Sequence, residues 1–147
     1  MNEKILVLDF GGQYNQLIAR RVRDLHVYAE IKPFDGITPE EIVAEGYCGI
    51  IFTGGPNSVY DMSSPHYDPK VLELGIPVLG ICYGAQLTAW MGGGSVITAE
   101  TSEYGKINVT VDVPESLLMQ DVPTESIVWM SHTDRIKNLP ESFRVTA

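Results

Sequence analysis

The sequence is short of basic residues. It holds 10 Lys and Arg against 19 Asp and Glu, for a net charge of −9 over 147 residues. This balance argues against a general nucleic-acid surface, because neutralising phosphates needs clustered Lys and Arg side chains. The one basic cluster is Arg20-Arg21 with Arg23, in an expected helix. It could form a solvated face or a face for a partner domain.

Histidines, cysteines and long apolar runs are also scarce. The three histidines lie far apart, without a ligand-like neighbour at helical spacing, so we expect no metal site. The two cysteines, Cys48 and Cys82, are expected to be reduced, because an unsecreted chain of this size needs no disulfide. No opening apolar run is long enough for a signal peptide or a membrane span, which predicts a cytoplasmic protein with no membrane partner.

Apolar runs alternate with helical patterns through the first ninety residues. Each run has the character of a strand buried on both faces, as in a parallel sheet. The pattern therefore predicts an α/β fold, an open and mostly parallel sheet with helices on both faces. The expected strands are Lys4–Phe10, Val27–Ile31, Gly49–Thr53 and a short one before Cys82; the expected helices are Gln13–Leu25, a capped one after Thr38, Pro69–Leu74 and Gly84–Met91.

The remainder of the chain has a weaker pattern. A turn is expected at Thr101–Gly105, followed by a half-exposed strand at Lys106–Val111. Another strand, Ile127–Met130, should lead into Ser131–Asp134, and Phe143–Ala147 should begin a further strand.

Cys82 stands between two glycines directly after a short apolar strand. The pattern Gly80-Ile-Cys-Tyr-Gly84 is typical of a nucleophile turn, where the chain passes sharply from strand to helix and exposes the residue at its apex. Side chains at the two glycine positions would collide as strand and helix close on each other. The following helix directs its positive end at the sulfur, which favours the thiolate. Cys82 is therefore predicted to be a reactive nucleophile rather than a buried apolar residue.

Two glycine pairs follow other expected strands. Gly11-Gly12 lacks the Gly-x-Gly-x-x-Gly spacing of a dinucleotide site, and no Walker-type loop occurs in the chain. Gly54-Gly55-Pro56 could be a simple turn. Beside Cys82, however, its free amides could hold the negative oxygen of a tetrahedral intermediate, which acyl transfer requires.

Five motifs together resemble a known family: Leu8-Asp-Phe-Gly-x-Gln-Tyr, Ala19-Arg-Arg-Val-Arg23, Gly54-Gly-Pro, Gly80-Ile-Cys-Tyr-Gly-x-Gln86 and Trp129-Met-Ser-His-x-Asp134. The chain is similar over essentially its whole length to the glutamine amidotransferase domain of GMP synthetases, a class I amidotransferase. The resemblance implies a flavodoxin-like fold, with residues 1–147 as one glutaminase domain that is incomplete at its C-terminus.

The resemblance also implies roles for individual residues. Cys82 would attack the side-chain amide of L-glutamine, giving a thioester and ammonia, and the N–H groups of Gly55 and Tyr83 would form the oxyanion hole. Gln86 would help to position the glutamine. The remaining substrate-binding residues would be Glu103, Tyr104, Gly105, Ser131 and His132.

In the family, the ammonia passes to an ATP-pyrophosphatase domain or subunit that aminates XMP to GMP. The resemblance thus implies no cofactor in this chain, with ATP and Mg bound by the synthetase part. It also allows a homodimer formed through that part.

Three departures from the family pattern stand out. Gly12 and Thr133 take the places where the family more often has Ser and Gly, which we expect to matter little. The family's catalytic base is a histidine in a downstream His-Pro-Glu motif, and no His-x-Glu occurs here. Because general acid–base help is worth about 10² to 10⁴ in rate, we expect these residues alone to be inactive or very slow.

Two other functions fit the residues without that family. The chain could be a non-catalytic flavodoxin-like module that binds a small ligand or a partner at the strand ends. It could also be another cysteine hydrolase on a similar sheet, with His132 or His66 as its base.

Overall fold

The computed structural model describes residues 3–147, apart from the side chains of residues 100–103. The chain divides into two compact units, one ending at Gly93 and the other beginning at Gly94. No helix among the described residues has the length and apolar character needed to span a membrane.

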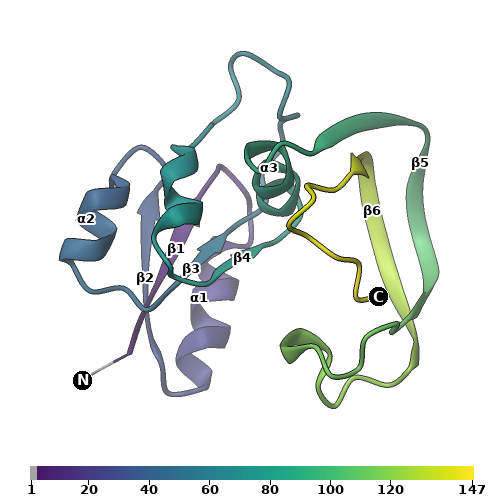
Figure 1. The fold of residues 1–147 in the computed structure, drawn as a ribbon, viewed down its shortest axis with the longest axis horizontal. Helices are drawn as coiled ribbons and strands as arrows, with labels where there is room; N and C mark the ends of the chain where they lie inside the picture. The colour runs from purple at the N-terminus through teal and green to yellow at the C-terminus, as the bar shows by residue number, and fades with distance from the viewer. Residues whose placement is uncertain (1–2) are drawn as a thin grey trace. The chain divides into compact units, whose positions relative to one another are not determined.

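A four-stranded parallel sheet forms the centre of the first unit (Figure 1). Its strands are β1 (Lys4–Asp9), β2 (Tyr28–Pro33), β3 (Gly49–Phe52) and β4 (Val78–Gly80), in the order β2-β1-β3-β4. This order is that of the first four strands of a flavodoxin-like sheet, whose ligands bind at the carboxyl ends of the strands. The predicted α/β fold is confirmed.

Helices connect these strands close to the predicted positions. They are α1 (Asn15–Asp24), α2 (Pro39–Ala44), a 3₁₀ helix at Pro69–Glu73 and α3 (Tyr83–Met91). The predicted cap of α2 is a full capping box, in which the Thr38 hydroxyl accepts from the Glu41 N–H and the Glu41 carboxylate accepts from the Thr38 N–H.

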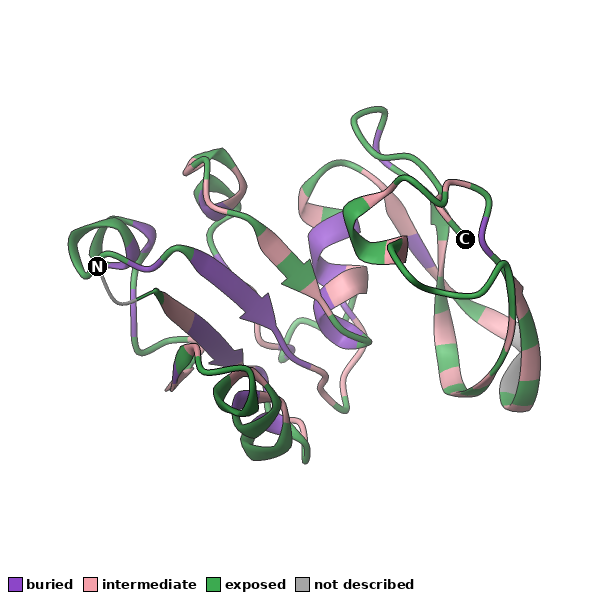
Figure 2. Ribbon diagram, turned by 90° about the horizontal axis from the view of Figure 1, so that it is seen from below, coloured by how far each residue is buried: buried purple, intermediate pink, exposed green. Residues whose placement is uncertain are grey.

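Both faces of the sheet are covered. Leu6, Val7 and Leu8 of β1 point to alternate faces, yet each is fully buried. On one face Val7 packs with Ala19 of α1, and Figure 2 shows buried residues concentrated in the strands of the sheet. This double burial is why β1 has a continuous apolar sequence rather than an alternating one.

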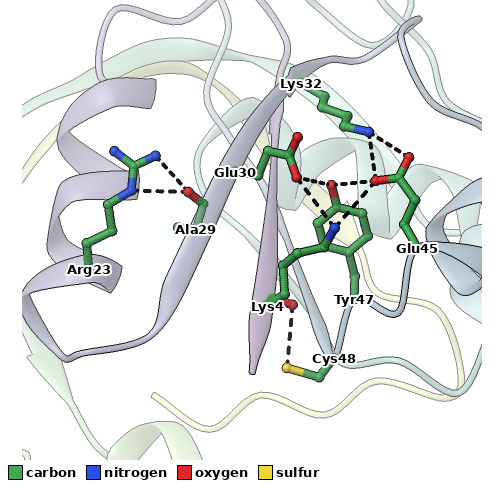
Figure 3. A network of polar contacts seen from close by, with 8 residues as sticks. All are labelled: Lys4, Arg23, Ala29, Glu30, Lys32, Glu45, Tyr47 and Cys48. Atoms are coloured by element: carbon green, nitrogen blue, oxygen red, sulfur yellow. Dashed lines mark hydrogen bonds and ion pairs between the residues drawn. The ribbon is translucent and has the colours of Figure 1, made fainter. Parts of the chain in front are cut away.

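The basic cluster on α1 does not act as one surface. The Arg23 guanidinium donates twice to the Ala29 carbonyl of β2, at 3.1 and 2.6 Å, which fastens α1 to the edge strand (Figure 3). Arg21 is exposed and pairs with Asp24. Arg23 therefore has a structural role that neither expected use of the cluster included.

A polar network covers part of the β2 edge (Figure 3). Lys32 bonds the Glu45 carboxylate at 2.8 and 2.9 Å, and the Tyr47 hydroxyl donates to Glu30 at 2.7 Å. The bond from Lys32 holds the pKa of Glu45 below its usual range. Burial, together with the Glu30 carboxylate, raises the pKa of Tyr47. Lys4 lies over the Tyr47 ring, 4.0 Å from its centre.

The second unit is built on a two-stranded antiparallel ribbon, β5 (Ser95–Thr110) and β6 (Glu125–Asn138) (Figure 1). A 3₁₀ helix at Leu117–Met119 lies between them in sequence. Exposed and half-buried residues alternate along β6, as expected of a ribbon whose two faces differ in solvent exposure.

Three predictions about the second unit are wrong. The turn expected at Thr101–Gly105 is part of β5, because pairing with β6 continues there and a register shift between Thr98 and Glu103 takes up the extra residues. Ser131–Asp134 lie within β6 rather than after it. Residues Phe143–Ala147 form no strand; instead the Thr146 carbonyl accepts from the N–H groups of Asp112 and Val113.

Candidate active site

Cys82 lies at the tip of a sharp turn between β4 and α3. Its backbone has φ 55° and ψ −115°, a conformation that an L-residue adopts only when its surroundings enforce it. The side chain is exposed, and its sulfur makes no hydrogen bond to any residue that the structure describes. The predicted nucleophile turn, defined as Gly80–Gly84, is thus present with the strain that the pattern implied.

The two glycines of the nucleophile turn are required by close packing. A Cβ at Gly84 would lie 2.2 Å from the Phe52 carbonyl oxygen, and one at Gly80 would lie 2.6 Å from Ala85 Cα. No real Cβ approaches backbone atoms this closely. Helix α3 can therefore lie this close to β3 and β4 only with glycine at both positions.

Backbone hydrogen bonds tie the nucleophile turn to β3. The Ile81 N–H donates to the Phe52 carbonyl at 2.9 Å, and the Gly84 N–H donates to the Thr53 carbonyl at 3.0 Å. Thr53 is fully buried, and its hydroxyl donates to the Leu8 carbonyl at 2.8 Å and accepts from the Phe10 N–H at 3.3 Å. The ends of β1, β3 and β4 are joined through these bonds.

The glycine loop Gly54-Gly55-Pro56 lies beside the sulfur. A Cβ at Gly54 would be 3.5 Å from Cys82 Cβ and 4.0 Å from its Sγ, whereas one at Gly55 would be 2.7 Å from the Phe10 carbonyl oxygen. The loop is thus pressed between β1 and the nucleophile. A Cβ at Gly54 would make an ordinary contact with the cysteine, whereas one at Gly55 would displace the loop from Phe10.

Two backbone N–H groups belong to the segments on either side of Cys82, one in the glycine loop and one at the start of α3. No hydrogen bond among the described residues uses the N–H of Gly55 or that of Tyr83, the first residue of α3. The Gln86 N–H, one turn on, bonds the Cys82 carbonyl at 3.1 Å. Free amides beside a nucleophile can stabilise an oxyanion, and the helix N-terminus adds to the positive potential.

The structure brings four of the predicted site residues together: Cys82, Gly55, Tyr83 and Gln86. The other five belong to the second unit, on the ribbon. Their backbones lie opposite one another, with Glu103 paired to His132 and Tyr104 paired to Ser131. The Glu103 side chain lies outside the described residues. That these five line a pocket with Cys82 stays a prediction of the resemblance.

The alternation of β6 divides the ribbon residues between its two faces. Ser131 is exposed and shares its face with Tyr104, whose hydroxyl lies 3.4 Å from Thr133. His132 is half-buried and points to the opposite face. The side chains of Ser131 and His132 therefore cannot both face one pocket, so at least one of them could contribute only through its backbone.

Neither of the other histidines is arranged as a partner of Cys82. His66 Nε2 lies 2.9 Å from the Val59 carbonyl oxygen, and its ring packs on Trp90 at 5.1 Å between centres. His26 follows the C-cap of α1 and has φ 62°. Among the described residues, no cluster of three His, Cys, Asp or Glu side chains could hold a metal ion.

Sequence reasoning missed one residue of the site, Thr53, and the side-chain contact of another, Tyr83. Thr53 joins the three strand ends, and a single polar residue that closes an apolar strand before two glycines is a signal that could have marked it. The Tyr83 side chain is buried, and its hydroxyl donates to the Pro65 carbonyl at 2.6 Å. Nothing local in the sequence indicates that bond.

A parallel α/β sheet that carries a strained, exposed cysteine beside a free-amide loop defines a class of cysteine-nucleophile enzymes. The family model of class-I glutamine amidotransferases matches residues 6–147, and the chain belongs to that family. The resemblance found in the sequence is thus confirmed.

Bacterial relatives agree with this family. The chain is 53% identical to the glutamine-hydrolysing GMP synthase of Lactobacillus acidophilus over 99% of its length, and 56% identical to that of Acetivibrio thermocellus over 97%. It spans 28% and 27% of those two proteins, little more than a quarter of their length.

Solved structures agree as well. A GMP synthase subunit from Thermoplasma acidophilum matches with a TM-score of 0.85 and 36% identity, over 99% of this chain and 72% of that one. A glutamine amidotransferase of Thermotoga maritima matches with a TM-score of 0.73 at 21% identity, over 96% of this chain and 64% of that one, which bears on the fold alone.

Proposed function

We propose that this chain is the glutaminase part of a GMP synthase, in which Cys82 hydrolyses L-glutamine to supply ammonia for the amination of XMP to GMP. The observation that carries the proposal is the strained, exposed Cys82 beside the free amides of Gly55 and Tyr83. The likeness to the two GMP synthases supports the choice of this branch within the family.

The chemistry follows from this arrangement. The Cys82 thiolate attacks the side-chain carbonyl carbon of glutamine, and the carbonyl oxygen takes the negative charge within reach of the two amides. When the oxyanion collapses, the C–N bond breaks and the nitrogen leaves as ammonia after gaining a proton. A γ-glutamyl thioester remains. Water then attacks the thioester, which releases glutamate and returns the thiol.

Proton transfer in both steps requires a general base. The family resemblance assigns this role to the histidine of a His-Pro-Glu motif, which these 147 residues do not contain. We therefore assign His66 and His132 no part in proton transfer. The Val59 and Trp90 contacts of His66 support a structural role for that residue.

The partner of this glutaminase is an ATP-pyrophosphatase domain or subunit, with ATP and Mg bound there and no cofactor bound by the residues described here. The net charge of −9 is consistent with a small-molecule enzyme rather than a nucleic-acid-binding protein. We assign the protein to the cytoplasm, where purine nucleotides are made.

The test is glutaminase turnover of the protein that contains this chain, with ammonia and glutamate measured together. Cys82→Ser should abolish both products, because a hydroxyl without an activating environment is a far weaker nucleophile. Cys48→Ser is the matched control and should retain wild-type turnover, since the Cys48 thiol donates to the carbonyl of Lys4, at the opposite end of the sheet from the glycine loop. Glutamine hydrolysis that survives Cys82→Ser would overturn the proposal, as would cleavage of peptides in place of glutamine.

A further inference from the structure

The residue after the nucleophile has a buried side chain with a partner of its own. Tyr83 is 1% exposed, and its hydroxyl donates to the Pro65 carbonyl at 2.6 Å. Its ring packs on Phe10 at 5.8 Å between centres, below the glycine loop. Burial raises the pKa of Tyr83, while the Ser64 hydroxyl opposes that shift, so the phenol remains a donor at neutral pH.

Pro65 belongs to the connecting loop, residues 57–68, which runs from the glycine loop to the 3₁₀ helix. A second contact secures this loop to α3, because the His66 ring packs on Trp90. Within the loop, the Ser64 hydroxyl donates to the Ser58 carbonyl. The loop is thus attached to α3 near both ends of that helix, by Tyr83 at its start and by Trp90 in its last turn.

We propose that the Tyr83 side chain is a positioning residue for glutamine hydrolysis, which holds the two oxyanion amides in fixed relation to each other. One amide is its own N–H. The other belongs to Gly55, two residues before the connecting loop to which its hydroxyl is bonded. This inference rests on the proposed glutaminase function and adds a role for a side chain in it.

The hydrogen bond from Tyr83 to Pro65 matters because the backbone of Cys82 is strained. A residue at φ 55° and ψ −115° keeps that conformation only while its neighbours prevent relaxation. The Gly84 N–H bonds restrain the turn on one side of Tyr83, and the bond to Pro65 restrains Tyr83 itself. Without the hydroxyl, the Pro65 carbonyl loses its partner and the first peptide of α3 can rotate toward a relaxed conformation.

The chain offers a closely matched control. Tyr67, in the same connecting loop two residues after Pro65, is also buried, and its hydroxyl also donates to a backbone carbonyl at 2.6 Å, but it bonds the loop to Ile37 rather than to α3. Tyr83→Phe and Tyr67→Phe therefore delete the same bond at two places in the first unit. Both variants should lose similar stability, and only Tyr83→Phe should impair the site.

The test compares two electrophiles on the wild-type chain and on both variants. With a glutamine chloroketone, the Cys82 thiolate adds to the ketone, whose oxygen takes the negative charge. The sulfur then displaces chloride from the adjacent carbon while its bond to the carbonyl carbon breaks and the ketone re-forms, which leaves a thioether. Iodoacetamide reacts by direct displacement of iodide, without an oxyanion. We expect Tyr83→Phe to slow the chloroketone about tenfold, a fraction of the roughly 10²- to 10³-fold cost of losing one oxyanion donor, with iodoacetamide unchanged.

Each outcome separates this inference from the proposed function. If the wild-type chain shows no preference of the chloroketone for Cys82, the proposed function fails first. If the wild type is selective but Tyr83→Phe reacts at the wild-type rate, or Tyr67→Phe is slowed equally, the positioning role is wrong. If Tyr83→Phe slows both electrophiles alike, the side chain affects only access to the thiol and the inference is also overturned.

Discussion

The two units of the chain differ in how they bury apolar residues. Within the described residues, the buried hydrophobic core belongs almost entirely to the first unit, and Val96 and Val111 are its members from the second. The ribbon instead exposes Trp129 to 74%, and Leu117, between its strands, is exposed to 83%. A strained nucleophile needs a backbone held from several sides, and the double-covered sheet provides this. A two-stranded ribbon has no comparable core.

The largest effect should come from a methyl group at the nucleophile turn. Gly84→Ala places a Cβ 2.2 Å from the Phe52 carbonyl oxygen, so β3 and α3 must separate. We expect a loss of more than about 3 kcal/mol in the free energy of unfolding, measured with urea, and loss of chloroketone labelling at Cys82.

Gly75→Ala is the control for this change. Gly75 has φ 70° but no heavy atom within 4 Å of a Cβ, so backbone strain alone should cost about 1–2 kcal/mol and labelling should persist. Equal stability of the two variants would show that the close contact at Gly84 is not what shapes the turn.

The next largest effect contrasts a buried residue of the first unit with an exposed residue of the second. Leu8 is fully buried in β1, whereas Ile127 in β6 is 66% exposed. Truncation of Leu8 to Ala should cost about 2–5 kcal/mol, and Ile127→Ala should stay within about 0.5 kcal/mol, by urea unfolding. A large cost at Ile127 would mean that the exposed face of the ribbon is covered in solution, and the contrast between the units would not hold.

A smaller effect is expected at the bond that joins the strand ends. Thr53→Val keeps the shape of the side chain but removes its bonds to the Leu8 carbonyl and the Phe10 N–H. Because both backbone groups remain buried, the loss should be about 1–3 kcal/mol. Thr110→Val, at an exposed position of β5, should be nearly neutral. If the two substitutions cost the same, Thr53 does not organise the carboxyl end of the sheet.

The smallest effect appears only at alkaline pH and concerns three buried tyrosines, all in the first unit. Burial raises the pKa of Tyr67 to about 12, and the pKa values of Tyr47 and Tyr83 are raised as well. A raised folded-state pKa contributes stability that is complete below the unfolded value, near 10, and is lost as the pH rises through the folded value. The first unit should therefore weaken between about pH 10 and 12.

One tryptophan in each unit allows that measurement. In a Trp129→Phe variant, the fluorescence of Trp90 reports on the first unit alone. Its urea midpoint should fall across this alkaline range, and Tyr67→Phe should reduce the slope. A flat profile, or a slope unchanged by Tyr67→Phe, would contradict the assignment.

The difference between the two units also explains which features could be predicted from the sequence. The elements of the first unit are specified largely by neighbouring residues, such as the Thr38 cap or the glycines around Cys82, so the fold and the strained turn at Cys82 were both predictable. The bond from Tyr83 to Pro65 was not, because it joins residues that only the folded sheet brings together.

The ribbon shows the opposite case. Thr101–Gly105 has the composition of a turn, but pairing with β6, some thirty residues away, keeps the backbone extended. The same pairing extends β6 through Ser131 and His132, which a local pattern ending at Met130 did not predict. Pairing between strands that lie far apart in the sequence overrides local propensity. Such pairing cannot be predicted from the residues of one strand alone.

The central claim is that the first unit forms a glutamine-selective nucleophile at Cys82, and site-mapped labelling of both cysteines tests it most directly. Cys48 and Cys82 are both exposed, so exposure alone predicts that any thiol reagent modifies both. Iodoacetamide should label the two sites, whereas a glutamine chloroketone should label Cys82 alone, and free glutamine should slow that reaction. Equal chloroketone labelling of Cys48 and Cys82 would contradict the account.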